Sequence, residues 1–155
     1  MLREPAERVS PRARWMWTLG AVIRSLVLGG LVGAWVVAGD GPVAVLIVVL
    51  VVLVGYVIVM PQWRFRVHRW EATQTAVYTQ TGWWAREQRI APMSRIQTVD
   101  YVEGPVARLF GLASVTVTTA SAAGALAIEG LDKDRARVLT DELTTRADSV
   151  AGDAT

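Results

Sequence analysis

An uninterrupted apolar run over residues 43–60 constrains this chain more than any other feature. The run, VAVLIVVLVVLVGYVIVM, contains no charged side chain. At about 1.5 Å per residue a helix of this length spans roughly 27 Å, close to the roughly 30 Å hydrocarbon core of a bilayer. A buried helix of a soluble protein would normally carry a polar stripe, and this run has none. We therefore predict a membrane span.

A second apolar segment precedes this run and predicts another span over about residues 17–38. Arg24 lies about two turns inside it, at a cost of about 1–3 kcal/mol that falls if the side chain reaches back to the headgroups. Two interpretations of Arg24 stay open: snorkelling, which we favour, and pairing with a partner protein or an anionic lipid. Residues 1–14 are predicted to be a disordered cytoplasmic tail, because a cleaved signal peptide fits poorly with two successive apolar segments.

Residues 39–42, Gly-Asp-Gly-Pro, predict a tight turn between the two spans. The turn carries one negative charge, whereas arginines flank the transmembrane hairpin predicted over residues 15–60. The positive-inside rule then places both termini in the cytoplasm and the turn outside. Since arginine supplies every basic side chain except Lys133, a bias typical of GC-rich bacterial genomes, we expect a multi-pass protein of a bacterial cytoplasmic membrane.

Two further patterns concern the surroundings of the spans. Trp15, Trp17 and Trp63 lie where apolar and polar sequence meet, which predicts interfacial aromatic side chains. Gly29 and Gly33 form a G-x-x-x-G pair, which lets another helix approach closely. Packing within the hairpin, which we favour, and homodimerisation both stay open for this pair.

Residues 61–150 predict an α+β domain outside the membrane. Alternation over 63–70 predicts a strand with Arg64, Arg66 and His68 on one face. Further expected elements are strands over 75–82, 84–90, 96–102, 114–119 and 126–128, and one turn of helix over 106–112. Asp132 then caps an amphipathic helix, with a frayed tail over 151–155 and apolar positions at Ala136, Leu139, Leu143 and Ala147. The expected fold is a small barrel packed by this helix.

One continuous stretch resembles a known family. The run IAPMSRIQTVD at 90–100 continues through Gly104-Pro105, RLFG at 108–111 and ASVTVTT at 113–119. With the hairpin before it, this order resembles bacterial pleckstrin-homology (PH) domain proteins of the membrane-flanked type, over the hairpin and nearly all of residues 61–147. The resemblance implies a membrane-anchored α+β fold: a two-helix transmembrane hairpin, a PH-like β-roll and a C-terminal amphipathic helix. It implies little about activity and does not carry over phosphoinositide binding.

Within that stretch, some residues have a physical interpretation as structural positions. Gly111 is expected to permit a turn that a side chain would block. Leu109 and Phe110 are expected to seat the short helix on the sheet.

The side chains that carry most chemistry are scarce. The chain has no cysteine, which excludes a disulfide, a thiolate metal site and a cysteine nucleophile. His68 is the single histidine, and no phosphate-binding loop, G-x-S-x-G or H-E-x-x-H motif occurs. The carboxylates of the last helix (Asp132, Asp134, Asp141 and Glu142) suggest a solvated face. We expect no catalytic residue, metal, cofactor, small-molecule substrate or nucleic-acid partner.

Two functions remain. The one we favour is a non-catalytic protein-interaction or scaffold domain at the inner face of the membrane, where a sheet edge or groove takes a segment of a membrane-protein partner or of a second copy. The alternative is recognition of anionic lipid headgroups, with candidate contacts at Arg64, Arg66, His68 and Arg69. Trp83 and Trp84 would favour the lipid alternative if they entered the membrane interface.

Overall fold

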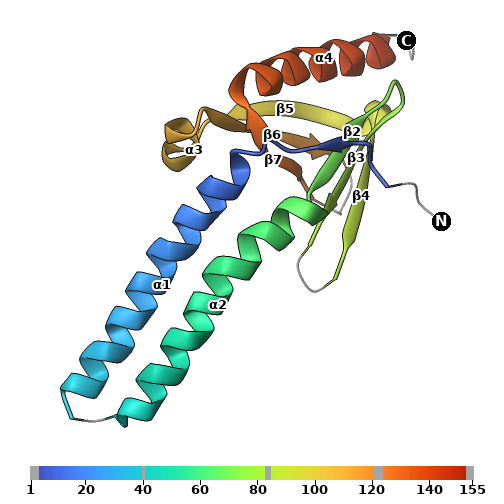
Figure 1. The fold of residues 1–155 in the computed structure, drawn as a ribbon. Coiled ribbons are helices and arrows are strands. Elements are labelled where there is room, and N and C mark those ends of the chain that lie inside the picture. Colours follow the sequence, from blue (N-terminus) through green and yellow to red (C-terminus); the bar gives the residue numbers. More distant parts are fainter. Residues whose placement is uncertain (1–3, 40, 83–84, 121–123, 153–155) are drawn as a thin grey trace.

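In the part of the chain that the structure describes, two long antiparallel helices are followed by a domain with two sheets (Figure 1). The computed structural model describes residues 4–39, 41–82, 85–120 and 124–152. Helices α1 (Ala13–Val37) and α2 (Val43–Val67) lie side by side and are each long and apolar enough to cross a membrane. Within each helix, an 18-residue window has a mean hydropathy of 1.8 in α1 and 3.3 in α2. The predicted fold class, an apolar hairpin followed by a β-roll and a C-terminal helix, is confirmed.

Helix α2 continues well past the end of the apolar run. It ends at Val67, and the His68 N–H donates to the Arg64 carbonyl as the last turn closes. The predicted strand over 63–70 is therefore wrong, because only its last two residues belong to β2 (Arg69–Ala72). The physical reason is that adding a residue to an existing helix costs much less free energy than nucleating a new element. The helix therefore continues beyond the membrane span until tertiary contacts end it.

The N-terminal segment is packed against the domain. Strand β1 (Glu7–Arg8) pairs antiparallel with β2, and the Ser10 N–H donates to the Gly130 carbonyl at 2.8 Å. Val9 and Ala13 are buried in the domain core. The prediction of a disordered tail over residues 1–14 therefore fails over residues 7–14, since the free edge of β2 and the apolar side chain of Val9 order this segment; residues 1–3 lie outside the described ranges.

Among the described residues, seven strands form two antiparallel sheets. The first sheet has the spatial order β1, β2, β3 (Ala76–Thr81), β4 (Glu87–Pro92). The second has the order β5 (Ile96–Val102), β6 (Leu112–Thr119), β7 (Leu126–Asp132). A single 3-10 turn, η1 (Met93–Arg95), joins the sheets. The predicted strand over 96–102 is confirmed at both ends, and β6 and β7 are longer than predicted.

Short helix α3 (Pro105–Leu109) lies between β5 and β6. Gly111, which follows it, has φ of +65° and so makes the predicted turn. Phe110 packs against the core as expected, but Leu109 is exposed. One turn of helix can present only one side to the sheet, which is why the prediction for Leu109 is wrong.

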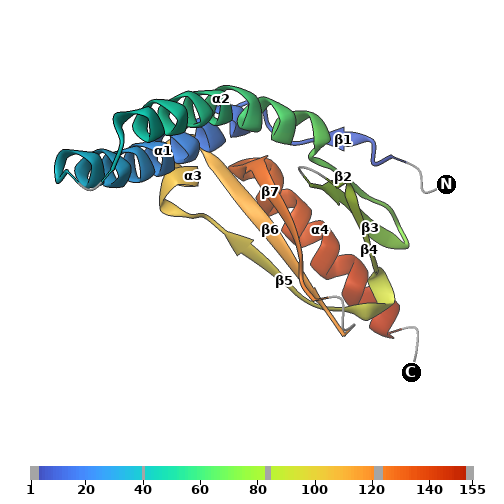
Figure 2. The same ribbon diagram turned by 90° about the horizontal axis from the view of Figure 1, so that it is seen from below.

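Helix α4 (Lys133–Gly152) closes the fold and lies along the sheet of β5 to β7 (Figure 2). Ala136, Leu139 and Leu143 are buried, as the amphipathic pattern predicts. The same core also contains side chains from the start of α1, including Trp17. The hairpin and the domain therefore share one hydrophobic core.

Candidate functional site

The base of the hairpin is built into the domain through Trp17. This side chain is 7% exposed, and the guanidinium carbon of Arg64 lies 4.5 Å from the centroid of its ring system. The His68 ring lies 5.2 Å from it, centroid to centroid. Trp17 is thus buried between the two helices and the sheets and does not face lipid, contrary to the prediction. Trp15 and Trp63 are exposed, so an interfacial position for them stays a prediction.

The four candidate headgroup contacts point in different directions. Because residues 63–67 are helical, Arg64 lies one turn before His68, the residue that follows α2, and both side chains turn toward the domain. Arg66 is exposed on another face, and Arg69 is half-buried on β2, opposite Arg8. The structure therefore does not gather these four side chains into one basic surface.

Arg64 is held by an ion pair. Its Nη2 lies 2.5 Å from Oε2 of Glu129 on β7, so the pair joins α2 to the second sheet. Sequence reasoning missed Glu129, because 65 residues separate the partners and no local pattern connects them. Only the tertiary fold brings them together.

His68 is buried beside this pair. Burial, and in second place the positive charge of Arg64, lower the pKa of His68 from 6.5 to about 4. Its Nδ1 has no hydrogen-bond partner among the described residues. The imidazole is therefore neutral near pH 7 and supplies no positive charge for an anionic headgroup.

A cleft of about 370 Å³ opens next to these groups. One wall is formed by Met60 and Arg64 at the end of α2 and by His68, which follows the helix. The other walls are β3 and β4, with Thr79, Thr81, Glu87 and Arg89, and β7, with Ala127 and Glu129. Because Met60 is the last residue of the apolar run, the cleft begins at the level where α2 leaves the predicted membrane span.

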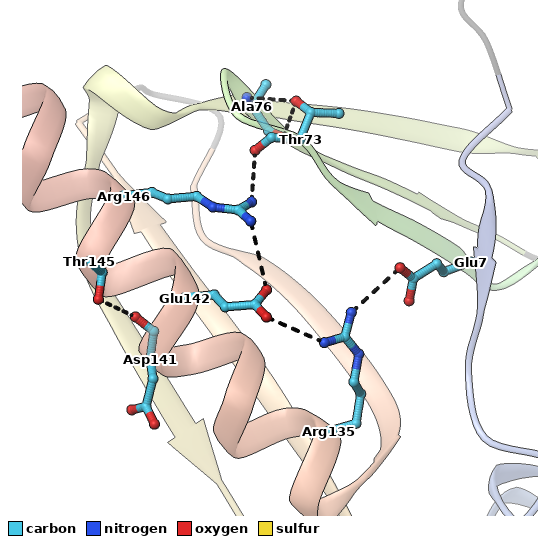
Figure 3. Close-up of polar contacts among 8 residues, drawn as sticks. All are labelled: Glu7, Thr73, Ala76, Arg135, Asp141, Glu142, Thr145 and Arg146. Carbon is cyan, nitrogen blue, oxygen red and sulfur yellow. Dashed lines mark hydrogen bonds and ion pairs between the residues drawn. The ribbon is translucent and has the colours of Figure 1, made fainter.

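A second polar cluster lies on α4 (Figure 3). Arg135 contacts Glu7 and Glu142 at 3.5 and 3.7 Å, and Arg146 lies 3.9 Å from Glu142 and donates to the Thr73 carbonyl at 3.1 Å. The chain of contacts links the N-terminal segment, α4 and the turn between β2 and β3. Such partly exposed pairs contribute little free energy each. We interpret this cluster as structural, and it shows that Glu142 is paired and not simply solvated.

The candidate helix-packing glycines have different surroundings. A Cβ added to Gly29 would lie 3.4 Å from Leu50 and 3.6 Å from Leu53 of α2, whereas one added to Gly33 would meet nothing within 4 Å. Gly29 thus packs within the hairpin. Arg24 points back along α1, since a Cβ added to Gly20 would lie 3.9 Å from its Nη2. This is the direction that snorkelling requires.

The remaining expectations concern metals and the tip of the β3–β4 hairpin. Within the described ranges, no group of three or more His, Cys, Asp or Glu side chains is placed to hold a metal ion. Trp83 and Trp84, which could have favoured the lipid alternative, lie outside the described residues.

Comparisons with known proteins agree with this architecture. The sequence model of the family described as "Bacterial PH domain" matches residues 19–147. The UPF0699 transmembrane protein YdbS of Bacillus subtilis (strain 168) is 28% identical over 150 residues, which cover 88% of this chain and 91% of that protein. No solved structure matches the chain. The two candidate spans and this transmembrane relative together indicate a membrane protein.

Proposed function

This chain belongs to the bacterial PH domain family, and from that premise we propose that it is a membrane-anchored, non-catalytic protein-interaction domain. In this proposal the hairpin holds the domain at the inner face of the cytoplasmic membrane, with both termini in the cytoplasm. The excess of arginine on the outer flanks of the hairpin supports this orientation. The partner is a second membrane protein or a second copy of this chain.

The observation that carries the proposal is the shared core of hairpin and domain. Trp17 from α1 and Val67 from α2 are both buried, and α2 enters the domain without a break. A domain joined in this way keeps one orientation relative to the membrane. It therefore presents the same surface to every protein that diffuses in the bilayer, and anchoring raises the effective concentration of such partners.

The alternative, recognition of anionic lipid headgroups, has less support from the geometry. Of the four basic candidates, Arg64 is engaged by Glu129 and His68 is neutral near pH 7. Arg66 and Arg69 remain, and each basic side chain near an anionic surface contributes about 1 kcal/mol. Two such contacts are weak, and they serve equally well to orient the hairpin.

The test is site-specific photocrosslinking of the full-length protein in its host membrane. A photoreactive amino acid would replace one of three exposed residues on different sides of the domain: Leu109, Ala127 or Val138. We expect at least one position to give a discrete adduct with a membrane protein or a second copy. Lipid adducts alone from all three positions, together with enrichment of anionic lipid that Arg66→Gln and Arg69→Gln abolish, would instead establish the lipid alternative.

The experiment requires the whole chain. A fragment that starts at residue 61 would lack Val9, Ala13 and Trp17, which belong to the core of the domain. Such a fragment would leave an apolar cavity and an uncovered edge of β2. Binding data from it would describe a damaged domain.

A further inference from the structure

Strand β7 is the last strand of its sheet, and part of its outer edge faces the cleft. The N–H of Ala120 donates to the Arg95 carbonyl, which shows that even-numbered residues of β6 direct their main chain toward β5. Thr116 is one of these residues, and it stands opposite Ala127. The N–H and C=O of Ala127 therefore point away from β6, toward the open edge.

The same edge already binds main-chain and side-chain donors at its two ends. The Ser10 N–H donates to the Gly130 carbonyl, and Nη1 of Arg89 donates to the Ala125 carbonyl at 3.3 Å. Between these ends, no main-chain hydrogen bond from another described segment reaches the outward N–H or C=O of Ala127. An edge of this kind can receive a short extended segment by strand addition.

The charges beside the edge favour a basic occupant. Two ion pairs flank the cleft, and in both the carboxylate is the more exposed partner: Glu129 is 42% and Arg64 29% exposed, and Glu87 is 56% and Arg89 42% exposed. A carboxylate has acceptor capacity for more than one donor. Lysine or arginine side chains of an incoming segment can therefore bind Glu87 and Glu129 without separating them from their arginines.

The position of the cleft indicates which kind of segment can reach it. Met60 forms part of its wall, so the cleft lies where a cytoplasmic segment emerges from the membrane. Cytoplasmic flanks of membrane spans are enriched in lysine and arginine. The location of the cleft, the open strand edge and the exposed carboxylates therefore all favour a basic segment next to a membrane span.

We propose that the edge of β7 at Ala127 binds the extended, basic juxtamembrane segment of a partner membrane protein, with Glu87 and Glu129 as contacts for its cationic side chains. This inference rests on the proposed function and names the surface and the partner class for it. The Thr79 and Thr81 side chains of β3 form the opposite wall, where side chains of the added segment would lie.

The direct test uses the full-length protein in nanodiscs of neutral phosphatidylcholine and two fluorescent peptides as probes, Lys-Val-Lys-Val-Lys-Val and Glu-Val-Glu-Val-Glu-Val. We expect the lysine peptide to bind at least about tenfold more tightly than the glutamate peptide, in a salt-dependent manner. Ala127→Pro removes the edge N–H and should weaken binding by about tenfold or more. Ala127→Ser keeps this donor and is the matched control. Empty nanodiscs correct for binding to lipid.

Two further measurements guard against trivial outcomes. Proline is tolerated where an edge N–H faces outward, and thermal unfolding would check that Ala127→Pro is folded. Glu87→Gln lies on another strand and should weaken binding of the lysine peptide alone, by about threefold or more. Any of three results would overturn the proposal: equal affinity for the two peptides, no binding up to millimolar peptide, or unchanged affinity of Ala127→Pro and Glu87→Gln for the lysine peptide.

Photocrosslinking separates this inference from the proposed function. A protein adduct from Ala127 that Glu87→Gln reduces would support both. An adduct from Leu109 or Val138, with none from Ala127, would keep the interaction function and overturn the β7 site. Lipid adducts alone from all three positions would refute both.

Discussion

Replacing Trp17 by alanine tests whether the hairpin and the domain share one core. The side chain is 7% exposed and lies against Arg64 and His68. Truncation of a large buried aromatic residue costs about 3–5 kcal/mol, and the stacked guanidinium adds about 0.5–2 kcal/mol that overlaps with this figure. We therefore expect Trp17→Ala to lower the free energy of opening of the domain by about 3–5 kcal/mol. Trp15→Ala is the matched control, because Trp15 is 66% exposed.

Hydrogen exchange of the full-length protein in nanodiscs is the suitable assay, since the spans themselves do not unfold in a bilayer. The core strand β6 carries Val115 and Val117, both fully buried, and reports on opening of the domain. A loss of about 3 kcal/mol corresponds to exchange about 10²-fold faster at these amides. Trp15→Ala should leave their rates nearly unchanged. Equal effects of the two substitutions would mean that Trp17 is an ordinary interfacial side chain and that the domain folds independently of α1.

Two other predictions use the same assay. The pKa of His68 lies at about 4 in the folded protein and at 6.5 otherwise, so the unfolded state takes up the proton first as the pH falls. The domain should keep its full stability above about pH 7 and lose about 2 kcal/mol by about pH 5; His68→Gln should remove this component, and an unchanged pH profile would contradict the burial of a neutral imidazole. Gly130→Ala should destabilise the domain by about 2 kcal/mol or more, because Gly130 has φ of +76° and a Cβ there would lie 2.7 Å from that of Ala13. Gly104→Ala, whose added Cβ meets nothing within 4 Å, should be nearly neutral.

Much of the architecture follows from the sequence because it depends on local or short-period signals. The charge-free run at 43–60 predicts a span from its length alone, and alternation over 96–102 predicts β5 to the residue. The helical spacing of Leu139 and Leu143 predicts the buried face of α4. Each of these signals is complete within a few turns or strand residues, so no distant partner is needed to interpret it.

The contacts between the hairpin and the domain, and the cleft beside them, could not be predicted from the sequence because they depend on tertiary structure. Apolar and polar side chains alternate over residues 63–67 as in a strand, yet these residues continue helix α2. Because a helix repeats about every 3.6 residues and a strand every two, Arg64 and His68 turn toward the domain and Arg66 is left exposed. Glu129 becomes the partner of Arg64 across 65 residues, and Val9 enters the core from a segment that is polar in composition. Sequence patterns specify which face of an element is apolar, but which elements meet is decided by packing over the whole chain, because burial and ion pairing act between residues that are close in space and far apart in sequence.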